Sequence, residues 1–272
     1  MNFLNQLRQR NTLLYYAGLV HLVAAGFSLF LILFSNQQLL GINVWIKPFK
    51  FMISVGIYLF TLAWLTGDIP NKRYVRLFSW QIIICFVVEM GAVIGQAARG
   101  LKSHYNTDSA EGAIIYALMG IFILYNTILV ITLTYRYFRG RFPQLSRPYL
   151  WGVRLGLLLF LLGSVEGMYM SSQTGHTVGA ADGGPGLPLL NWSTQYGDLR
   201  VAHFIGLHGL QVLMLLGAWL GSRSGTRQSG TRQSGTRRGT YWVAGTFALM
   251  LAFTILTYWQ AIRQLPLISF WQ

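Results

Sequence analysis

The stretch that decides the fold is residues 197–220, GDLRVAHFIGLHGLQVLMLLGAWL. Its second half is almost entirely hydrocarbon, and the whole stretch is long enough for a helix that crosses a lipid bilayer. Its first half nevertheless carries Arg200, His203, His208 and Gln211. Because an ionisable side chain inside a membrane is costly, these residues have to face protein or water. They therefore indicate a polar site near one end of the helix.

The rest of the chain has the composition of an integral membrane protein. Of its 272 residues, 53% are hydrophobic and only 10% are charged, whereas a soluble protein carries about a quarter charged residues. The hydrophobic residues form seven long blocks. Since lipid offers the backbone no hydrogen-bond partner, they predict an all-α bundle of seven transmembrane helices. The expected spans are approximately residues 11–35, 46–67, 75–98, 112–135, 149–171, 200–221 and 241–262.

The basic residues predict the orientation of the chain. Lys and Arg concentrate before the first span and in every second loop after it, which places the N-terminus in the cytoplasm and the C-terminus outside. The same asymmetry explains the formal charge of +14, because anionic lipid at the cytoplasmic surface attracts basic loops. We therefore expect a multi-pass protein of the cytoplasmic (inner) membrane, with the lipid bilayer rather than nucleic acid as its partner.

Two loops stand out. Residues 172–199 contain no lysine or arginine and end where the sixth span begins. Their glycines and prolines mark tight turns, whereas Leu189, Trp192 and Tyr196 would favour burial, so we expect an ordered outer cap loop. Residues 222–240 contain the repeat SGTRQ, whose composition cannot form a core. This segment is predicted to be a disordered, basic cytoplasmic linker.

Four of the predicted spans bring ionisable side chains into the outer half of the membrane. At a rise of 1.5 Å per residue, Glu89 and His208 both lie about 12 Å below the outer end, and Lys50 and Glu166 about 6 Å below it. Unpaired charges at these depths would be costly. We therefore predict that Lys50 pairs with Glu166 and His208 with Glu89, in an outward-facing polar cavity. The same cavity is expected to include Lys47, Gln96, Arg99, Asp198, Arg200 and His203.

Three motifs support this grouping. They are NVWIKPFKFMIS (43–54), QAARGLKSHYNTDS (96–109) and HTVGAADGGPGLPLLNWSTQYGDLRVAHFIGLHGLQ (176–211). Together they resemble a family of uncharacterised bacterial multi-pass membrane proteins, over roughly residues 40–212. The resemblance brings no reaction, cofactor or partner. It implies that His104, His176 and Asp182, which lie in the shared motifs, belong with the transmembrane cavity.

The first functional hypothesis is a membrane-embedded enzyme or redox protein. The candidate ligands of a haem iron or a metal ion are His203, His208, His104 and His176. The spacing of His203 and His208 does not place both rings on one helical face, as a zinc pair would require. The nearby cations disfavour a bare metal ion, whereas they would hold the propionates of a haem or an anionic substrate. Glu89 with His208 is a candidate catalytic acid–base couple. The single cysteine, Cys85, excludes an internal disulfide and a multi-cysteine metal site.

Two other hypotheses remain open. The cations and the cap loop also suit a transporter or binding protein for an anionic small molecule or a lipid headgroup, although no inverted repeat is visible. A seven-helix sensor is the third hypothesis. The sequence leaves open the ligand, the oligomeric state and whether the protein is an enzyme.

Overall fold

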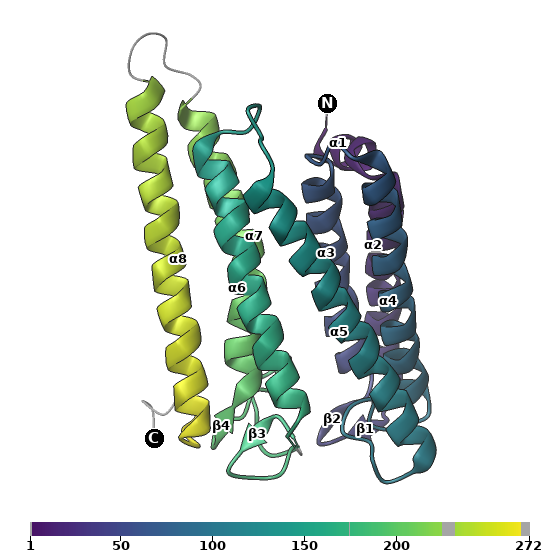
Figure 1. Cartoon of the computed structure of the whole chain (residues 1–272). Helices are drawn as coiled ribbons and strands as arrows, with labels where there is room; N and C mark the ends of the chain where they lie inside the picture. The colour runs from purple at the N-terminus through teal and green to yellow at the C-terminus, as the bar shows by residue number, and fades with distance from the viewer. Residues whose placement is uncertain (1, 174, 225–231, 268–272) are drawn as a thin grey trace. The chain divides into compact units, whose positions relative to one another are not determined.

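The computed structural model describes residues 2–173, 175–224 and 232–267. Seven of its helices are long and apolar enough to cross a membrane, which confirms the all-α bundle and makes the chain a polytopic membrane protein (Figure 1). These helices are α2 (Thr12–Phe34), α3 (Ile46–Thr66), α4 (Lys72–Ala98), α5 (Ala110–Arg139), α6 (Arg147–Ser171), α7 (Leu199–Ser224) and α8 (Arg232–Ile262).

The remaining elements are short. Helix α1 (Phe3–Arg10) precedes the first span, and each of two hairpins has strands of two residues. Strands β1 (Gln38–Leu39) and β2 (Ile42–Asn43) pair antiparallel, as do β3 (Thr177–Val178) and β4 (Gly197–Asp198). The chain divides into two compact units, unit 1 (Met1–Leu129) and unit 2 (Val130–Gln272).

The side chains on the outer faces of the helices are those that a bilayer requires. Large apolar side chains such as Val20, Leu33 and Leu249 are 65%, 72% and 73% exposed. In water such faces would be unfavourable, whereas hydrocarbon is their natural solvent. The exposed apolar faces therefore agree with a chain that lies in a lipid bilayer.

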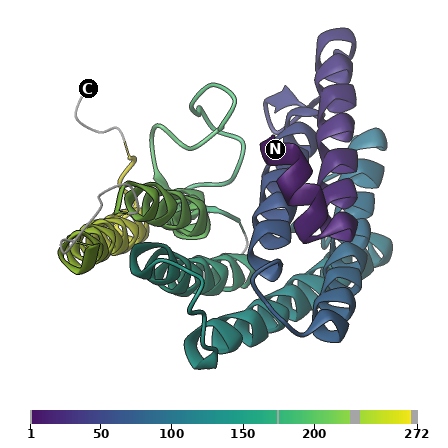
Figure 2. The same cartoon turned by 90° about the horizontal axis from the view of Figure 1, so that it is seen from above.

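In unit 1, the N-terminal helix is tied to the span that follows α2. Helix α1 lies across the ends of α2 and α3 (Figures 1 and 2). Arg10 forms an ion pair with Asp68, donates from Nε to the carbonyl of Trp64 at 2.9 Å and stacks over the Trp64 ring. Next to it, the Asn11 amide donates to the hydroxyls of Thr66 and Ser79, at 2.9 and 2.8 Å. These bonds satisfy the buried polar groups at this end of the unit.

In unit 2, α6 and α7 pack closely because glycines line both helices. A Cβ on Gly206 would lie 2.7 Å from the Cα of Gly163, and one on Gly152 would lie 2.3 Å from the carbonyl oxygen of Leu213. Small residues allow backbones to approach in this way, which is how membrane helices gain packing without a hydrophobic driving force.

The predicted linker differs in part from the structure. Helix α7 continues to Ser224 and α8 begins at Arg232, so helix occupies both ends of the segment 222–240 that was expected to be disordered. Helix propagation from the adjoining spans explains this, because each added residue gains a backbone hydrogen bond once the helix is nucleated. The remainder of that prediction concerns residues 225–231, which lie outside the described residues.

The close approach of α6 and α7 is testable with an added methyl group. Gly206→Ala should destabilise the protein by about 1–3 kcal/mol, because the new Cβ overlaps backbone atoms that cannot move independently. Gly245→Ala in α8 is the matched control, since a Cβ there meets nothing within 4 Å. The midpoint of thermal unfolding in detergent should fall only for Gly206→Ala, and equal midpoints would contradict the packing.

Candidate functional site

The candidate residues fall into one group in each unit. Unit 1 holds Lys47, Lys50, Glu89, Gln96, Arg99 and His104, and unit 2 holds Glu166, His176, Asp182, Asp198, Arg200, His203 and His208. The predicted pairs Lys50–Glu166 and Glu89–His208 each join a residue of one unit to a residue of the other. Both pairs remain predictions.

A tight hairpin places the first lysine of unit 1. Leu40 and Gly41 connect β1 to β2 with φ angles of 51° and 78°, the left-handed pair of a two-residue hairpin turn. Asn43 then joins two helices: its amide donates to the carbonyl of Ser35 at 2.6 Å, and its Oδ1 accepts from the Trp45 backbone at 3.0 Å. Helix α3 therefore starts at Ile46, directly after the hairpin.

The N-terminus of α3 is electrostatically unusual. Trp45 makes no side-chain capping hydrogen bond, and the first turn contains no acidic residue. Lys47 lies in this turn and Lys50 follows one turn later, both half-buried. The positive end of a helix dipole ordinarily attracts anionic groups and disfavours cations. Two lysines at this position therefore make a strongly electropositive helix start.

The loop between α4 and α5 brings a histidine to Lys47. The Nζ of Lys47 lies 3.1 Å from Nδ1 of His104, and the hydroxyl of Ser103 lies 3.1 Å from the same nitrogen. The His104 ring packs edge-on against Phe51, whose face also carries Lys47. Because an ammonium only donates, Nδ1 of His104 acts as the acceptor toward Lys47.

Arg99 supports this loop. At the end of α4, Gly100 adopts a φ of 70°, a conformation that glycine adopts without strain, and the helix ends there. Arg99 then forms a two-pronged ion pair with Glu111 of α5, with Nη2–Oε2 at 2.8 Å. The hydrogen bond to Glu111, reinforced by its charge, raises the pKa of Arg99. This partner of Arg99 could not be predicted from the helical pattern, because Glu111 is supplied across a loop.

Glu89 is the buried acid of unit 1. It lies on the inward face of α4, one turn from Val93 and two turns from Gln96, and is only 6% exposed. Lys47 is the charged residue that acts on its carboxylate electrostatically. We call Lys47, Lys50, Glu89 and His104 the lysine cluster.

In unit 2, Asp198 anchors the cap loop to α7. This residue, 3% exposed, accepts from Arg200 at both oxygens, with Nε–Oδ1 at 2.9 Å and Nη2–Oδ2 at 2.6 Å. Its Oδ2 also accepts from the backbone of Ser193 at 2.8 Å, and Arg200 donates to the carbonyl of Asn191. The guanidinium therefore serves to fold the loop back onto the start of α7.

A second carboxylate, that of Asp182, stabilises the first part of the cap loop. Oδ1 of Asp182 lies 3.0 Å from Nδ1 of His176 and accepts from the Thr177 backbone at 2.9 Å. Burial alone would raise the pKa of Asp182, but the hydrogen bonds and the charge of His176, together with the bonds from Thr177, outweigh it and hold this pKa well below its usual range. Asp182 is therefore held in its ionised form.

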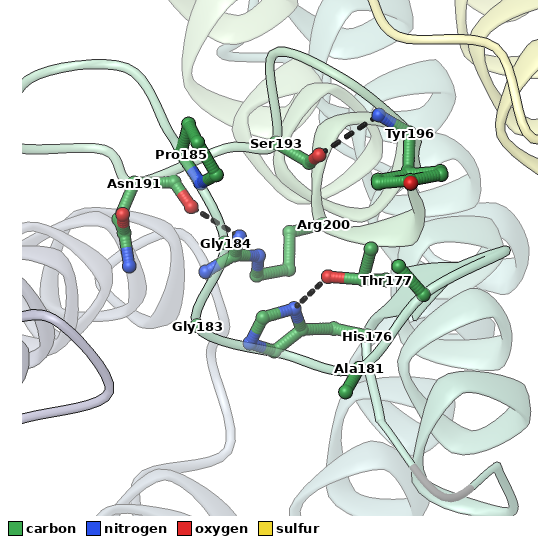
Figure 3. A pocket seen from close by; sticks show the side chains of 11 residues that line it. His176, Thr177, Ala181, Gly183, Gly184, Pro185, Asn191, Ser193, Tyr196 and Arg200 are labelled. Carbon is green, nitrogen blue, oxygen red and sulfur yellow. Dashed lines mark hydrogen bonds between the residues drawn. The ribbon is translucent and has the colours of Figure 1, made fainter.

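The partners of these two carboxylates, His176 and Arg200, both line a small pocket. His176, Arg200, Tyr196, Asn191 and Ser193 line it together with the turn at Gly183 and Gly184 (Figure 3). Its volume is about 30 Å³, and a bound water needs roughly 10–15 Å³. The pocket therefore has room for about two water molecules, which is far too little for a haem.

Other parts of the cap loop pack less completely than expected. Trp192 packs edge-on against Phe204 of α7, as an ordered loop requires. Leu189 and Tyr196, however, are 54% and 39% exposed. The expectation that they are buried is therefore wrong within the described chain. Leu189 has a φ of 63°, so it belongs to a tight turn, and turns lie at surfaces.

The two metal-ligand candidates of α7 are held by backbone carbonyls. Nδ1 of His203 lies 2.7 Å from the carbonyl of Gly163, and a Cβ on Gly167 would overlap its ring. Nδ1 of His208 lies 2.9 Å from the carbonyl of Phe204, and its ring stacks on Phe204. Within residues 2–173, 175–224 and 232–267, no group of three His, Cys, Asp or Glu could hold a metal ion.

Glu166 lies in α6, next to Gly167, which packs against the ring of His203. Its Oε2 is buried and has no hydrogen-bond partner among the described residues. Tyr258 of α8 is close enough for electrostatic interaction with it. The inward position of this carboxylate follows from the cost of exposing a charge to lipid.

Comparisons with family models, curated proteins and solved structures find no match to this chain.

The anchoring role of Asp182 predicts a pH dependence of the cap loop. Because its pKa is lower in the folded chain than the unfolded value of about 3.9, Asp182 contributes stability above that value and loses it as the pH falls through the folded pKa. Hydrogen exchange of the backbone at His176 and Thr177 should therefore accelerate in strong acid, and Asp182→Asn should show the fast exchange already at pH 7. Asp108→Asn is the control, because Asp108 is 78% exposed. Unchanged exchange in Asp182→Asn would contradict the anchor.

Proposed function

We propose that this chain binds an anionic small molecule or a lipid headgroup at the lysine cluster of unit 1. The observation that carries the proposal is the position of Lys47, at the uncapped start of α3 and in contact with His104. A helix N-terminus with a basic side chain beside it is the arrangement with which proteins bind phosphates and carboxylates. The proposal favours a binding or transport role over the redox role that the histidines of α7 first suggested.

The distribution of charge supports this choice. Among the predicted anion-binding cations, Arg99 and Arg200 are each paired with a carboxylate, Glu111 and Asp198. Such pairs are structural, because a carboxylate already occupies the guanidinium fork. Lys47 contacts a histidine nitrogen. An anion beside it would also interact favourably with the dipole of α3.

We infer the membrane side from the basic residues. The lysine cluster lies at the end of unit 1 that holds the β1–β2 hairpin and the α4–α5 loop (Figure 1). The opposite end carries Arg8, Arg10, Lys72 and Arg73, which the positive-inside rule assigns to the cytoplasm. On this basis the cluster faces the exterior, or the periplasm if the membrane is a bacterial inner membrane.

Inorganic phosphate and glycerol 1-phosphate are the probes for this site. Isothermal titration calorimetry of the full chain in detergent should detect binding that weakens at high salt, because the contact is electrostatic. Lys47→Met, which keeps an unbranched side chain but removes the charge, should weaken binding by about tenfold or more. Lys102→Met is the matched control, since Lys102 lies in the same loop region and pairs with Asp108 at 3.6 Å. Equal effects of the two substitutions would overturn the proposal.

One observation favours a second candidate, a haem-binding redox protein. The bond between His203 Nδ1 and the Gly163 carbonyl leaves Nε2 as the ligating nitrogen, in the tautomer that metal-bound histidines use. The close fit of the ring against Gly167 argues for a packing role instead.

An absorption spectrum distinguishes the two candidates. If the anion site is the function, the detergent-purified protein, oxidised and then reduced with dithionite, should show no Soret band and no stoichiometric metal. A Soret band that disappears in His203→Ala but persists in Lys47→Met would establish the haem candidate instead.

A further inference from the structure

Arg154 is a cation inside a membrane-spanning helix of unit 2. It lies in α6, seven residues after Arg147, with which the helix begins. This distance is about 10 Å along the helix axis, and Arg154 is half-buried there. Because a guanidinium keeps its charge in proteins, it has to meet an acid, water or an anionic lipid group. The surroundings of the guanidinium therefore decide what Arg154 can bind.

Three contacts hold this guanidinium in place. Its Nε donates to the backbone carbonyl of Tyr137 at 2.9 Å, in the last turn of α5. The ring centroids of Phe138 and Trp151 lie 5.5 and 5.4 Å from its Cζ, within the range of a cation–π interaction. Among the described residues, these are its partners, and none of them accepts a hydrogen bond from Nη1 or Nη2. Both outer nitrogens therefore remain as donors for a ligand.

The guanidinium lies toward the end of unit 2 at which α5 ends and α6 begins (Figure 1). Side chains on a helix incline toward its N-terminus, and Trp151 is one turn nearer that end than Arg154. Arg147, which is exposed, lies within about 20° of Arg154 around the helix axis. The two arginines and Trp151 therefore form a basic and aromatic stripe that runs to the start of α6.

This end of unit 2 is rich in arginine and has no acid of its own. Residues 130–154 contain no aspartate or glutamate and five arginines, at positions 136, 139, 141, 147 and 154. The three acids of the unit lie late in α6 and in the cap loop, toward the opposite end: Glu166, Asp182 and Asp198. The counter-charge of Arg154 therefore does not come from unit 2.

We propose that Arg154, Trp151 and Phe138 form a binding site, the arginine fork, for the phosphodiester of an anionic phospholipid. The two outer nitrogens of a guanidinium match two phosphate oxygens, and the two rings give the site an apolar wall. A zwitterionic headgroup suits the site less, because the neighbouring arginines would repel its ammonium.

The positive-inside rule assigns this end to the cytoplasm, where basic pockets between helices bind anionic headgroups. The arginine fork is therefore expected in the inner leaflet. It belongs to unit 2 and does not depend on the lysine cluster of unit 1.

Native mass spectrometry of the full chain in detergent tests the selectivity of this site. Phosphatidylglycerol should bind at least about tenfold more tightly than phosphatidylcholine, because only the first carries a net negative charge. Equal affinities for the two lipids would overturn the proposal.

A substitution tests whether Arg154 is the ligand. Arg154→Met keeps an unbranched side chain but removes the donors, and it should weaken phosphatidylglycerol binding by about tenfold or more. Arg141→Met is the matched control, since Arg141 is an exposed arginine in the loop that follows α5, and it should change the affinity by less than about threefold. Equal losses would indicate general charge attraction and overturn the site. The same difference should persist when both substitutions are made in Lys47→Met, which excludes a contribution from the lysine cluster.

A conservative variant covers the case in which Arg154→Met does not fold. Arg154→Lys keeps the charge but presents a point charge in place of a planar fork, so the affinity for phosphatidylglycerol should still fall by about threefold or more. Unchanged affinity in Arg154→Lys would overturn the fork.

Glycerol 1-phosphate distinguishes a lipid from a soluble phosphate as the ligand. It carries the phosphate without acyl chains, whose burial contributes most of the affinity of a lipid. At equal concentration it should therefore fail to displace phosphatidylglycerol. Displacement would identify a soluble phosphate as the ligand and overturn the lipid site.

Discussion

The structure depends on one constraint: a hydrocarbon layer offers no hydrogen bonds. Backbone groups satisfy themselves in helices, which is why most of the described chain is helical. Polar side chains have to find partners in the same way. Asn11 with Thr66 and Ser79, and Tyr58 with Asn126 at 3.0 Å, are buried examples. Each pair joins segments far apart in the sequence, so the demand for partners also specifies which helices meet.

The same constraint moves charge toward the helix ends and pairs it there. Arg10 with Asp68, Arg99 with Glu111 and Arg200 with Asp198 all lie at or beyond the limits of the spans. The exposed pair of Arg99 with Glu111 contributes little to stability, about 0–1 kcal/mol, whereas the acids of the other two pairs are buried. The role of all three pairs here is geometric, because each one connects a loop to a helix end.

The spans were predictable from the sequence because membrane thickness alone determines their length. Helix α1 was not predicted, since eight residues give too short a pattern and its position depends on Arg10 contacting Trp64. The site residues named from the sequence remain a prediction. Arg99 and Arg200 were assigned to an anion, whereas their partners are Glu111 and Asp198, because ion pairs across loops depend on backbone geometry that no helical periodicity encodes. The close packing of His203 against Gly163 and Gly167 was likewise invisible, since it needs the α6–α7 contact.

Glu89 is a buried acid in a membrane-spanning helix, and its presence there needs an explanation. Insertion of an acidic residue at mid-membrane costs about 2.5–3.5 kcal/mol, and a chain that needed only packing at position 89 would lose nothing by using an apolar residue. Gln96 shows that this region of α4 can supply a partner for a buried polar group, because Arg99 reaches it. For Glu89, the charged side chain within electrostatic range is Lys47 of α3. An opposite charge nearby offsets part of the cost of burying a carboxylate. The electrostatic attraction between these two residues therefore favours the neighbouring placement of α3 and α4 in unit 1.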